Sequence, residues 1–413
     1  MIPSLLLPIA AAAQGQVHVV DDDGGAGVDF TTLHEAIAAS MPGDSILIRE
    51  GTYQAVAATP SASPQFLIDH RLTVTAEQGA DVWLRSPVRI VGLGADETVV
   101  LRGLVIDLSF TSTSSSVNAL RLFSATGTVW AEDCLLRGFS GHTTFDDYDS
   151  PHTVDIEGGT LVLENSSISG GVVFGSSSGL GYTLRAKNAE VHMHGSTVTP
   201  PETSIFGAYP AVVFLDSLLY ASGSTFQGLK GLDAAIGPFG PVCATDGGPA
   251  VVLTGGTGST AYVLDSELIG GAAGDDPDCM AAQPGPGVET QQGQAFFLSG
   301  TARSLTAPPT AQAGGQVPLD FEGEPGEVVL LAAGATAAPL FLSLVAGTLL
   351  PSGVVAVVTA GTTGPNGELF YPAPLPPLAP GTEGFTLYLQ SVFVGATPVA
   401  SSASALLVTQ PAP

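Results

Sequence analysis

Hydrophobic positions recur at fixed offsets through the middle of the chain. Six segments each contain a glycine, asparagine or aspartate that is followed three positions later by an apolar residue. The residues two and four positions before it are also apolar in every copy. We number this residue as position zero, and the six are Gly103, Asp133, Asn165, Gly195, Gly223 and Asp265. Their separations of 30, 32, 30, 28 and 42 residues indicate one structural unit stacked on copies of itself.

The local pattern within each copy predicts two short strands joined by a corner. Glycine, asparagine and aspartate adopt positive φ at low cost, so position zero is where the chain turns. Alternating apolar residues before the corner, from Val99 and Leu101 to Ala261 and Val263, predict an inward-facing stripe. The residues between them form an outward stripe. We therefore predict an all-β chain built around a parallel β-helix.

A short helix is predicted near the N-terminal end of this solenoid. Residues 16–53 have the pattern of a strand, a glycine-rich turn, an amphipathic helix and a second strand. Thr32 and Glu35 have the spacing of a capping box, and Leu33 and Ile37 fall on one helical face. Such a helix can cover the open end of a solenoid, which otherwise exposes apolar core and unpaired strand edges.

This opening segment carries a family resemblance. The stretch DDDGGAGVDFTTLHEAIAASMPGDSILIREGTY resembles the N-terminal cap of pectin-lyase-like right-handed β-helix proteins, in which a DGG turn, an FTT-initiated helix and a GD-strand-GTY segment recur. Together with the repeats, the resemblance implies a right-handed parallel β-helix over residues 16–301. It implies the fold and does not fix an activity.

The character of the chain changes near residue 302. Residues 302–310, with Pro308 and Pro309, have the composition of a linker, and no lysine or arginine follows Arg303. Residues 311–413 contain strand-like runs separated by turn signals, which predicts an antiparallel β-sandwich with a role in attachment, sorting or capping. The predicted runs are 316–321, 327–332, 339–344, 354–359, 368–372, 385–394 and 405–409.

Composition limits the classes of partner. The 413 residues are 45% hydrophobic and 12% charged, as expected of a folded chain. Eleven basic residues against 38 acidic residues give a net charge of −27, which disfavours nucleic acid and anionic membrane surfaces as partners. The acidity is compatible with solubility in the cell exterior and with binding of divalent cations.

The N-terminal residues and the cysteines bear on localisation. Residues 1–13 form an apolar run that ends in alanines, which predicts a secretory signal peptide, although it lacks a basic start. No later run is long enough for a membrane span. We expect a secreted or cell-surface protein.

The three cysteines have different predicted states. Cys134 is predicted to be a buried free thiol, and Cys243 and Cys279 lie in loops of successive turns, where stacking can bring them together as a disulfide.

The first strand of each repeat carries candidate catalytic residues. Asp155 and Arg185 lie ten positions before zero in successive copies, so their side chains are expected to stack outward, one strand spacing apart. Lys187 repeats the pairing with Glu157, and Arg121 lies one turn away on the same face. The structural alternative is a charged ladder that keeps a flat sheet soluble.

An acidic loop precedes this strand. Asp146, Asp147, Asp149 and His152 supply oxygen and imidazole ligands that can hold a cation such as Ca²⁺. Pectin-lyase-like enzymes commonly use the corresponding strand face, so a cation-assisted uronate lyase in which Arg185 acts as base is one activity compatible with the resemblance. The chain lacks the family's tryptophan-aspartate-histidine lyase segment and the aspartate and glycine-histidine-glycine motifs of the related hydrolases. A solvated acidic turn is the alternative.

A second outward stripe is rich in aromatic residues. Three positions before zero it contains Trp130, His192, Tyr220 and Tyr262, and one position before zero it contains Glu132, Glu164 and His194. Aromatic rings beside carboxylates can bind sugars. Packing between turns explains the same residues. His192 and His194 with Glu164 also have donor types that bind a transition metal.

These features support two classes of function. The first is an exported β-helix protein that binds an extended polysaccharide, with uronate cleavage as the sharper version. The second is a noncatalytic structural or adhesive protein of the cell exterior.

Overall fold

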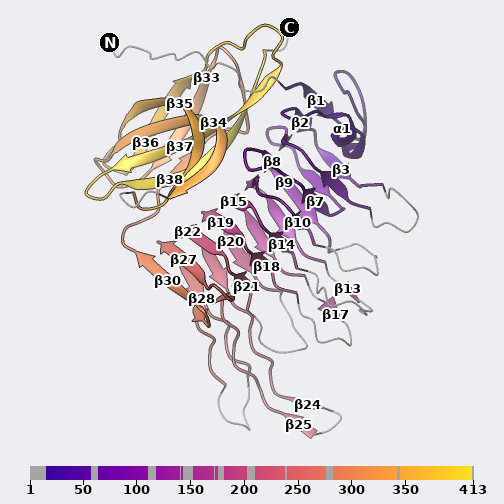
Figure 1. The fold of residues 1–413 in the computed structure, drawn as a ribbon, viewed down its shortest axis with the longest axis vertical. Helices are drawn as coiled ribbons and strands as arrows, with labels where there is room; N and C mark the ends of the chain where they lie inside the picture. Colours follow the sequence, from indigo (N-terminus) through magenta and orange to yellow (C-terminus); the bar gives the residue numbers. More distant parts are fainter. Residues whose placement is uncertain are drawn as a thin grey trace.

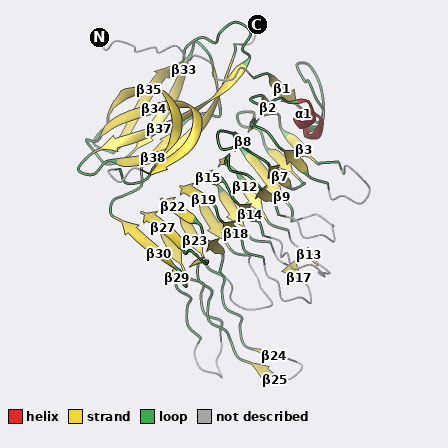
Figure 2. Ribbon diagram, in the orientation of Figure 1, coloured by secondary structure: helices red, strands yellow, loops and turns green. Residues whose placement is uncertain are grey.

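The chain folds into a right-handed parallel β-helix followed by an antiparallel β-sandwich (Figures 1 and 2). The structure is a computed structural model and describes residues 15–56, 64–109, 118–139, 141–142, 152–171, 173–174, 181–201, 210–237, 240–275, 282–341 and 345–411. The all-β prediction is confirmed. The predicted signal peptide, residues 1–13, lies outside the described residues.

Each complete turn of the solenoid contributes one strand to each of three parallel sheets, which we name in the order in which a turn visits them. The first sheet contains β4 (Phe66–Ile68), β7 (Val88–Val91), β10 (Leu120–Phe123), β14 (Val154–Glu157), β18 (Leu184–Lys187), β21 (Val212–Leu215), β26 (Val251–Thr254) and β29 (Val288–Thr290).

The second sheet is the longest. It contains β1 (Val17–Val20), β2 (Ser45–Ile48), β5 (Leu72–Ala76), β8 (Thr98–Arg102), β11 (Thr128–Glu132), β15 (Thr160–Glu164), β19 (Glu190–His194), β22 (Leu218–Ser222), β27 (Ser259–Leu264) and β30 (Gly293–Leu298).

The third sheet completes each turn. It contains β3 (Gly51–Tyr53), β6 (Val82–Leu84), β9 (Leu104–Asp107), β12 (Leu135–Arg137), β16 (Ser167–Ser169), β20 (Thr197–Thr199), β23 (Thr225–Gln227) and β28 (Glu267–Ile269). Longer connections lead from this sheet back to the first. They include two small pairs, β13 (Gly141–His142) with β17 (Val173–Phe174), and β24 (Ala235–Gly237) with β25 (Gly240–Val242).

The predicted corners lie between the second and third sheets. All six position-zero residues have positive φ, from 46° at Asp265 to 69° at Gly103. The corners are in register, because the backbone N–H at each of the first five donates to the carbonyl of the residue just before zero in the next turn. Examples are Asp133 to Glu164 at 3.0 Å and Asn165 to His194 at 2.9 Å. The prediction of a corner at each position zero is confirmed.

A ladder of small polar side chains runs beside the corners, at the residue after position zero. The backbone N–H of Ser166 donates to the hydroxyl of Ser196 at 3.1 Å, and Ser196 donates in the same way to Ser224 at 3.2 Å. Cys134 occupies this place in its own turn. Its thiol is free and buried as predicted, and burial raises its pKa to about 12. This thiol is therefore an inert packing group.

The solenoid core is continuous from turn to turn, and a helix covers its N-terminal end. α1 (Leu33–Ala39) begins after Thr32, whose hydroxyl accepts a hydrogen bond from the Glu35 backbone N–H at 3.2 Å. Leu33, Ala36 and Ile37 of this helix are buried in the same apolar cluster as the inward stripes. The capping helix is confirmed.

The C-terminal domain is a sandwich of two sheets. One contains β31 (Ser304–Thr306), β33 (Gln316–Glu322) and β36 (Glu368–Pro374). The other contains β32 (Thr310–Gln312), β38 (Val399–Thr409), β37 (Gly384–Val394), β34 (Val328–Phe341) and β35 (Thr348–Thr362). The long bulged strand β34 contains most of the predicted run 327–332 and the described part, 339–341, of the predicted run 339–344. Part of the predicted linker 302–310 forms β31.

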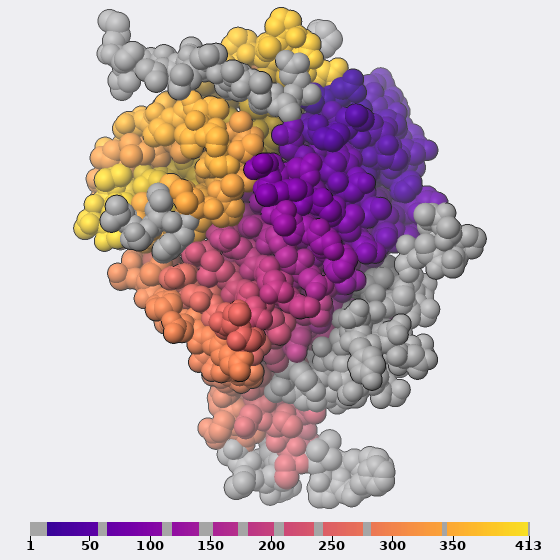
Figure 3. Space-filling view, viewed as in Figure 1, coloured from indigo at the N-terminus to yellow at the C-terminus, as the bar shows by residue number. Residues whose placement is uncertain are grey.

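The sandwich packs on the outer face of the second sheet (Figures 1 and 3). Val100, Trp130 and Val162 of the solenoid form one apolar cluster with residues of the sandwich, including Leu350 and Tyr388. The outward stripe of these turns is therefore an interface between domains. Within the part of the chain that the structure describes, no helix is long and apolar enough to cross a membrane.

Candidate functional site

The outer face of the first sheet carries a ladder of charged side chains. Asp155 on β14 is aligned with Arg185 on β18, as predicted. Arg121 lies on the same face, as expected, and is aligned with Asp155, whereas the count from position zero had placed Phe123 there. Arg185 donates two hydrogen bonds to the Asp155 carboxylate, at 2.8 and 3.1 Å, and Arg121 Nε lies 3.4 Å from it. Asp155 is 2% exposed. Its charge is matched by two guanidinium groups, which disfavours cation binding at this carboxylate.

A second ion pair lies beside the first. The Lys187 ammonium group is 2.8 Å from the Glu157 carboxylate, and the two residues are aligned on neighbouring strands. This hydrogen bond lowers the pKa of Glu157. The pair is partly exposed, so it contributes little to the free energy of unfolding.

Arg89 extends the ladder and was missed at the sequence level. It lies on β7, aligned with Arg121, and in the described chain no carboxylate pairs with it. The offset from position zero differs in this turn, which is why counting back from Gly103 did not find it. The local sequence would have identified Arg89 as an outward residue, because apolar Val88 and Ile90 flank it on the strand.

The first sheet therefore presents a basic strip on an acidic chain. Four of the eleven basic residues of the chain, Arg89, Arg121, Arg185 and Lys187, lie on it. They face only two acidic side chains on the same strands, Asp155 and Glu157. Rows of guanidinium groups bind carboxylates and sulfates through paired hydrogen bonds.

Of the four predicted metal ligands, the structure describes only His152. Asp146, Asp147 and Asp149 lie outside the described residues. His152 is buried, its ring stacks on Tyr182 at a centroid distance of 5.3 Å, and its Nδ1 accepts a hydrogen bond from the Tyr182 backbone N–H at 2.9 Å. Among the described residues no group of three or more histidine, cysteine, aspartate or glutamate side chains is arranged to hold a metal ion.

The part of the second outward stripe that contains Trp130 and Glu132 is covered by the C-terminal domain, whereas the sequence predicted an exposed surface. Trp130 is fully buried, its ring lies 5.3 Å from that of Tyr388 of the sandwich, and its Nε1 donates to Glu132 at 3.2 Å. Glu132 is itself 2% exposed and accepts hydrogen bonds from Ser404 and from the Ala405 backbone. These residues bind the C-terminal domain and cannot reach a polysaccharide while it is docked.

The next two turns bury titratable groups under the same domain. Glu164 has no exposed surface, and neither of its carboxyl oxygens has a hydrogen-bond partner among the described residues. Burial raises its pKa well above the usual range. The neighbouring His194 is 3% exposed, and burial lowers its pKa to about 3. Burial therefore favours the neutral form of both groups.

His194 borders a crevice between the domains. The crevice has a volume of about 340 Å³ and is also lined by Asn165, Ser222, Arg303 and Glu322. His192, His194 and Glu164 are not arranged as metal ligands in the described chain. The His192 Nε2 instead donates to the Glu190 carboxylate at 2.9 Å, and burial lowers the pKa of His192.

From His192 onward the stripe is a stack of rings. His192, Tyr220, Tyr262 and Phe296 are stacked with centroid separations of 4.8, 5.2 and 5.3 Å and interplanar angles of 10°, 9° and 17°. Rings stacked in this way cover one another's faces and present their edges outward. Sugars bind ring faces, so Tyr220 and Tyr262 do not form the flat platforms that the sequence suggested.

The cysteine prediction is tested in part. Cys243 is disulfide-bonded, whereas Cys279 lies outside the described residues. No protein-family model and no curated protein matches this chain.

Proposed function

We propose that this protein is exported and binds an extended anionic polysaccharide along the outer face of the first sheet. The observation that carries the proposal is a row on four successive strands that contains Arg89, Arg121, Asp155 and Arg185 in that order. Three of its four members are guanidinium groups, and the one carboxylate lies between Arg121 and Arg185. Successive strands of a sheet are about 4.8 Å apart, so a linear polymer that lies along the solenoid axis meets a guanidinium group repeatedly. Such a repeat favours a long ligand over a single small anion.

The charges of the strip support a polyanion. Arg89 has no carboxylate partner in the described chain, and Arg121 shares Asp155 with Arg185. Carboxylate or sulfate groups of a polymer can therefore be bound without breaking the pair between Asp155 and Arg185. The remaining surface is strongly acidic, which keeps such a polymer on this strip and makes binding sensitive to salt.

The experiment is a titration of the intact protein with polygalacturonate, with neutral dextran as a polymer control. We expect binding to polygalacturonate that weakens as salt increases, and no binding to dextran. The double variant Arg89→Gln and Arg121→Gln should weaken binding at least about tenfold, because it removes two charged donors. Lys230→Gln is the matched control, since Lys230 lies in a loop and pairs with Asp233 and Asp275.

Equal binding by wild type and the double variant would contradict the proposal. Absence of binding to polygalacturonate and to dextran sulfate would leave the noncatalytic structural or adhesive function, which the stacked rings and charged ladder also suit. The same samples distinguish binding from cleavage. A uronate lyase forms unsaturated products that absorb in the ultraviolet, and a chelator abolishes that signal if Ca²⁺ takes part.

A further inference from the structure

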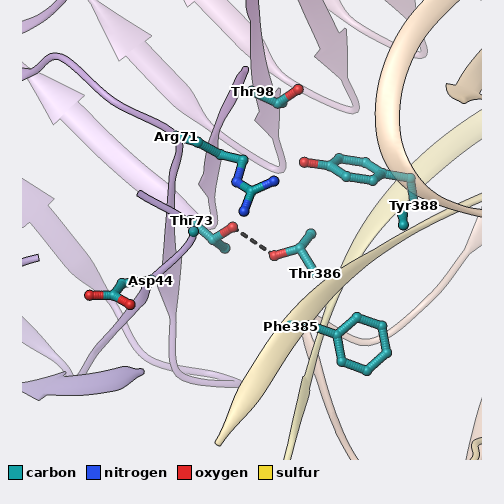
Figure 4. A pocket seen from close by; sticks show the side chains of 9 residues that line it. Asp44, Arg71, Thr73, Thr98, Phe385, Thr386 and Tyr388 are labelled. Carbon is teal, nitrogen blue, oxygen red and sulfur yellow. Dashed lines mark hydrogen bonds between the residues drawn. The ribbon is translucent and has the colours of Figure 1, made fainter. Parts of the chain in front are cut away.

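Arg71 lies at a second junction between the solenoid and the sandwich. Its guanidinium group lines a small cavity with Thr73 and Thr98 of the second sheet and with Thr386 and Tyr388 of β37 (Figure 4). Arg71 is partly exposed, and its charge acts on the Tyr388 hydroxyl across the junction. Every other basic side chain except Arg89 has a carboxylate within 4 Å. A partly exposed guanidinium group without a carboxylate partner at a domain junction can bind water or an anion.

Hydroxyl groups surround the same space. Thr98 is 3% exposed and Tyr388 is 4% exposed, and in Figure 4 the Tyr388 hydroxyl is directed toward Arg71. Thr73 and Thr386 share one hydrogen bond of 2.6 Å across the junction, so one of these two hydroxyls keeps its own hydrogen free to donate. Burial raises the pKa of Tyr388, which keeps its hydroxyl protonated as a donor.

Charge and size limit what the cavity can hold. Its volume is about 40 Å³, whereas a single water needs roughly 10 to 15 Å³ by the same measure, so a compact ion of a few non-hydrogen atoms fits. Asp44 also lines the cavity, but its carboxylate accepts hydrogen bonds from the backbone N–H groups of Gln16 and Met41, at 2.8 and 2.7 Å. The Thr98 hydroxyl is hydrogen-bonded to the Tyr388 oxygen. The groups left over are therefore the guanidinium group, the hydroxyl hydrogen of Tyr388 and that of either Thr73 or Thr386.

We propose that this cavity binds a small oxyanion, of the size of phosphate or sulfate, which bridges Arg71 of the solenoid and the hydroxyl groups of the sandwich. A charged guanidinium group with hydroxyl donors is the donor set that such anions require. The site is distinct from the basic strip on the first sheet. Because its two halves come from different domains, the anion binds the docked arrangement and stabilises docking.

The direct test is a calorimetric titration of the full chain with sodium phosphate and, separately, sodium sulfate, in a chloride-free buffer at pH 7. We expect one saturable site per chain. Arg71→Gln should reduce the affinity for the anion at least about tenfold. Arg71→Lys should reduce it less, because lysine keeps the positive charge but lacks the paired N–H donors of the guanidinium group. Arg137→Gln is the matched control, because it removes the same charge from a side chain on the third sheet that is 44% exposed.

Tyr388→Phe provides a second variant that removes only the hydroxyl group, and it should also weaken binding. The site could instead accept the terminal sulfate of a polymer, so dextran sulfate forms a separate arm. Loss of dextran sulfate binding in Arg71→Gln, with no binding of free phosphate or sulfate to wild type, would overturn a site for free oxyanions. Absence of a saturable site in wild type, or equal affinity in Arg71→Gln, would show that only water fills the cavity.

Discussion

The Arg102 guanidinium lies 2.9 Å from the Glu132 carboxylate, and both side chains are sealed beneath the C-terminal domain, with 2% exposure each. Arg102 also donates to the backbone carbonyls of Ala307 and Ala405, at 2.7 and 2.8 Å. Glu132 in turn accepts from Ser404 and from the Ala405 backbone N–H, both at 2.7 Å. The ion pair therefore joins two turns of the solenoid to the residue that follows β31 and to the last strand, β38.

The first prediction concerns this pair. Arg102→Met should lower the free energy of unfolding by about 3 to 5 kcal/mol, because it leaves the Glu132 carboxylate buried without its charge partner. Denaturant unfolding measures the loss. Lys187→Met is the control, since its pair with Glu157 is partly exposed and should cost at most about 1 kcal/mol. Similar losses in both variants would mean that Arg102 is not the anchor of the docked domain.

The second prediction concerns Glu164 as pH rises. Burial raises the pKa of Glu164 above the usual 4.5. The carboxyl group therefore binds its proton more tightly when the domains are docked than when the side chain is exposed. The stabilisation is full below pH 4.5 and is lost as pH rises through the raised pKa. Glu164→Gln should remove this alkaline slope. In a Trp83→Phe background Trp130 is the sole tryptophan, and its fluorescence reports docking at each pH. Glu157→Gln, on the exposed first sheet, should leave the slope unchanged.

The third prediction concerns His194 as pH falls. Burial lowers its pKa from 6.5 to about 3, so its neutral form is favoured in the docked state. The stabilisation is present above pH 6.5 and is lost as pH falls from there toward about 3. His194→Leu should flatten the stability profile between pH 6.5 and 4.5, measured by the same fluorescence. His34→Gln on α1 serves as the control, and an unchanged acid slope in His194→Leu would refute the assignment.

The sequence predicted the solenoid well because its signals are local. Position zero needs a positive φ, and only a few residue types adopt one cheaply, so Asp133 and Asn165 identify their own corners. Strand register then follows from the repeat length. The alignment of Asp155 with Arg185 and of Glu157 with Lys187 could therefore be predicted without any knowledge of long-range packing.

The burial of the second outward stripe could not be predicted in the same way. The alternation of apolar and polar residues along a strand separates inward from outward side chains, but it does not show whether another domain covers the outward ones. Trp130 and His192 were read as surface residues for this reason. One signal was available: Val100, Trp130 and Val162 form an apolar row on an outward face, and such rows are usually covered by another part of the protein. The partner was the sandwich already predicted from the C-terminal residues.

The last prediction returns to the corners. Asn165 has a φ of 49°, a conformation in which a β-branched side chain clashes with its own backbone. Asn165→Val should therefore cost about 2 kcal/mol of unfolding free energy, and Asn165→Gly should cost less than half as much, because glycine adopts this conformation freely. Denaturant unfolding of both variants provides the comparison.

Thr197→Val controls for the added β-branched apolar side chain, since Thr197 lies on β20 in the neighbouring turn and is half-buried in an extended strand. It should change the unfolding free energy by less than about 0.5 kcal/mol. If Asn165→Val were as mild as Thr197→Val, the corner would not require a left-handed residue. The repeat of position zero would then reflect side-chain packing, and the register of the charged ladder would need another cause.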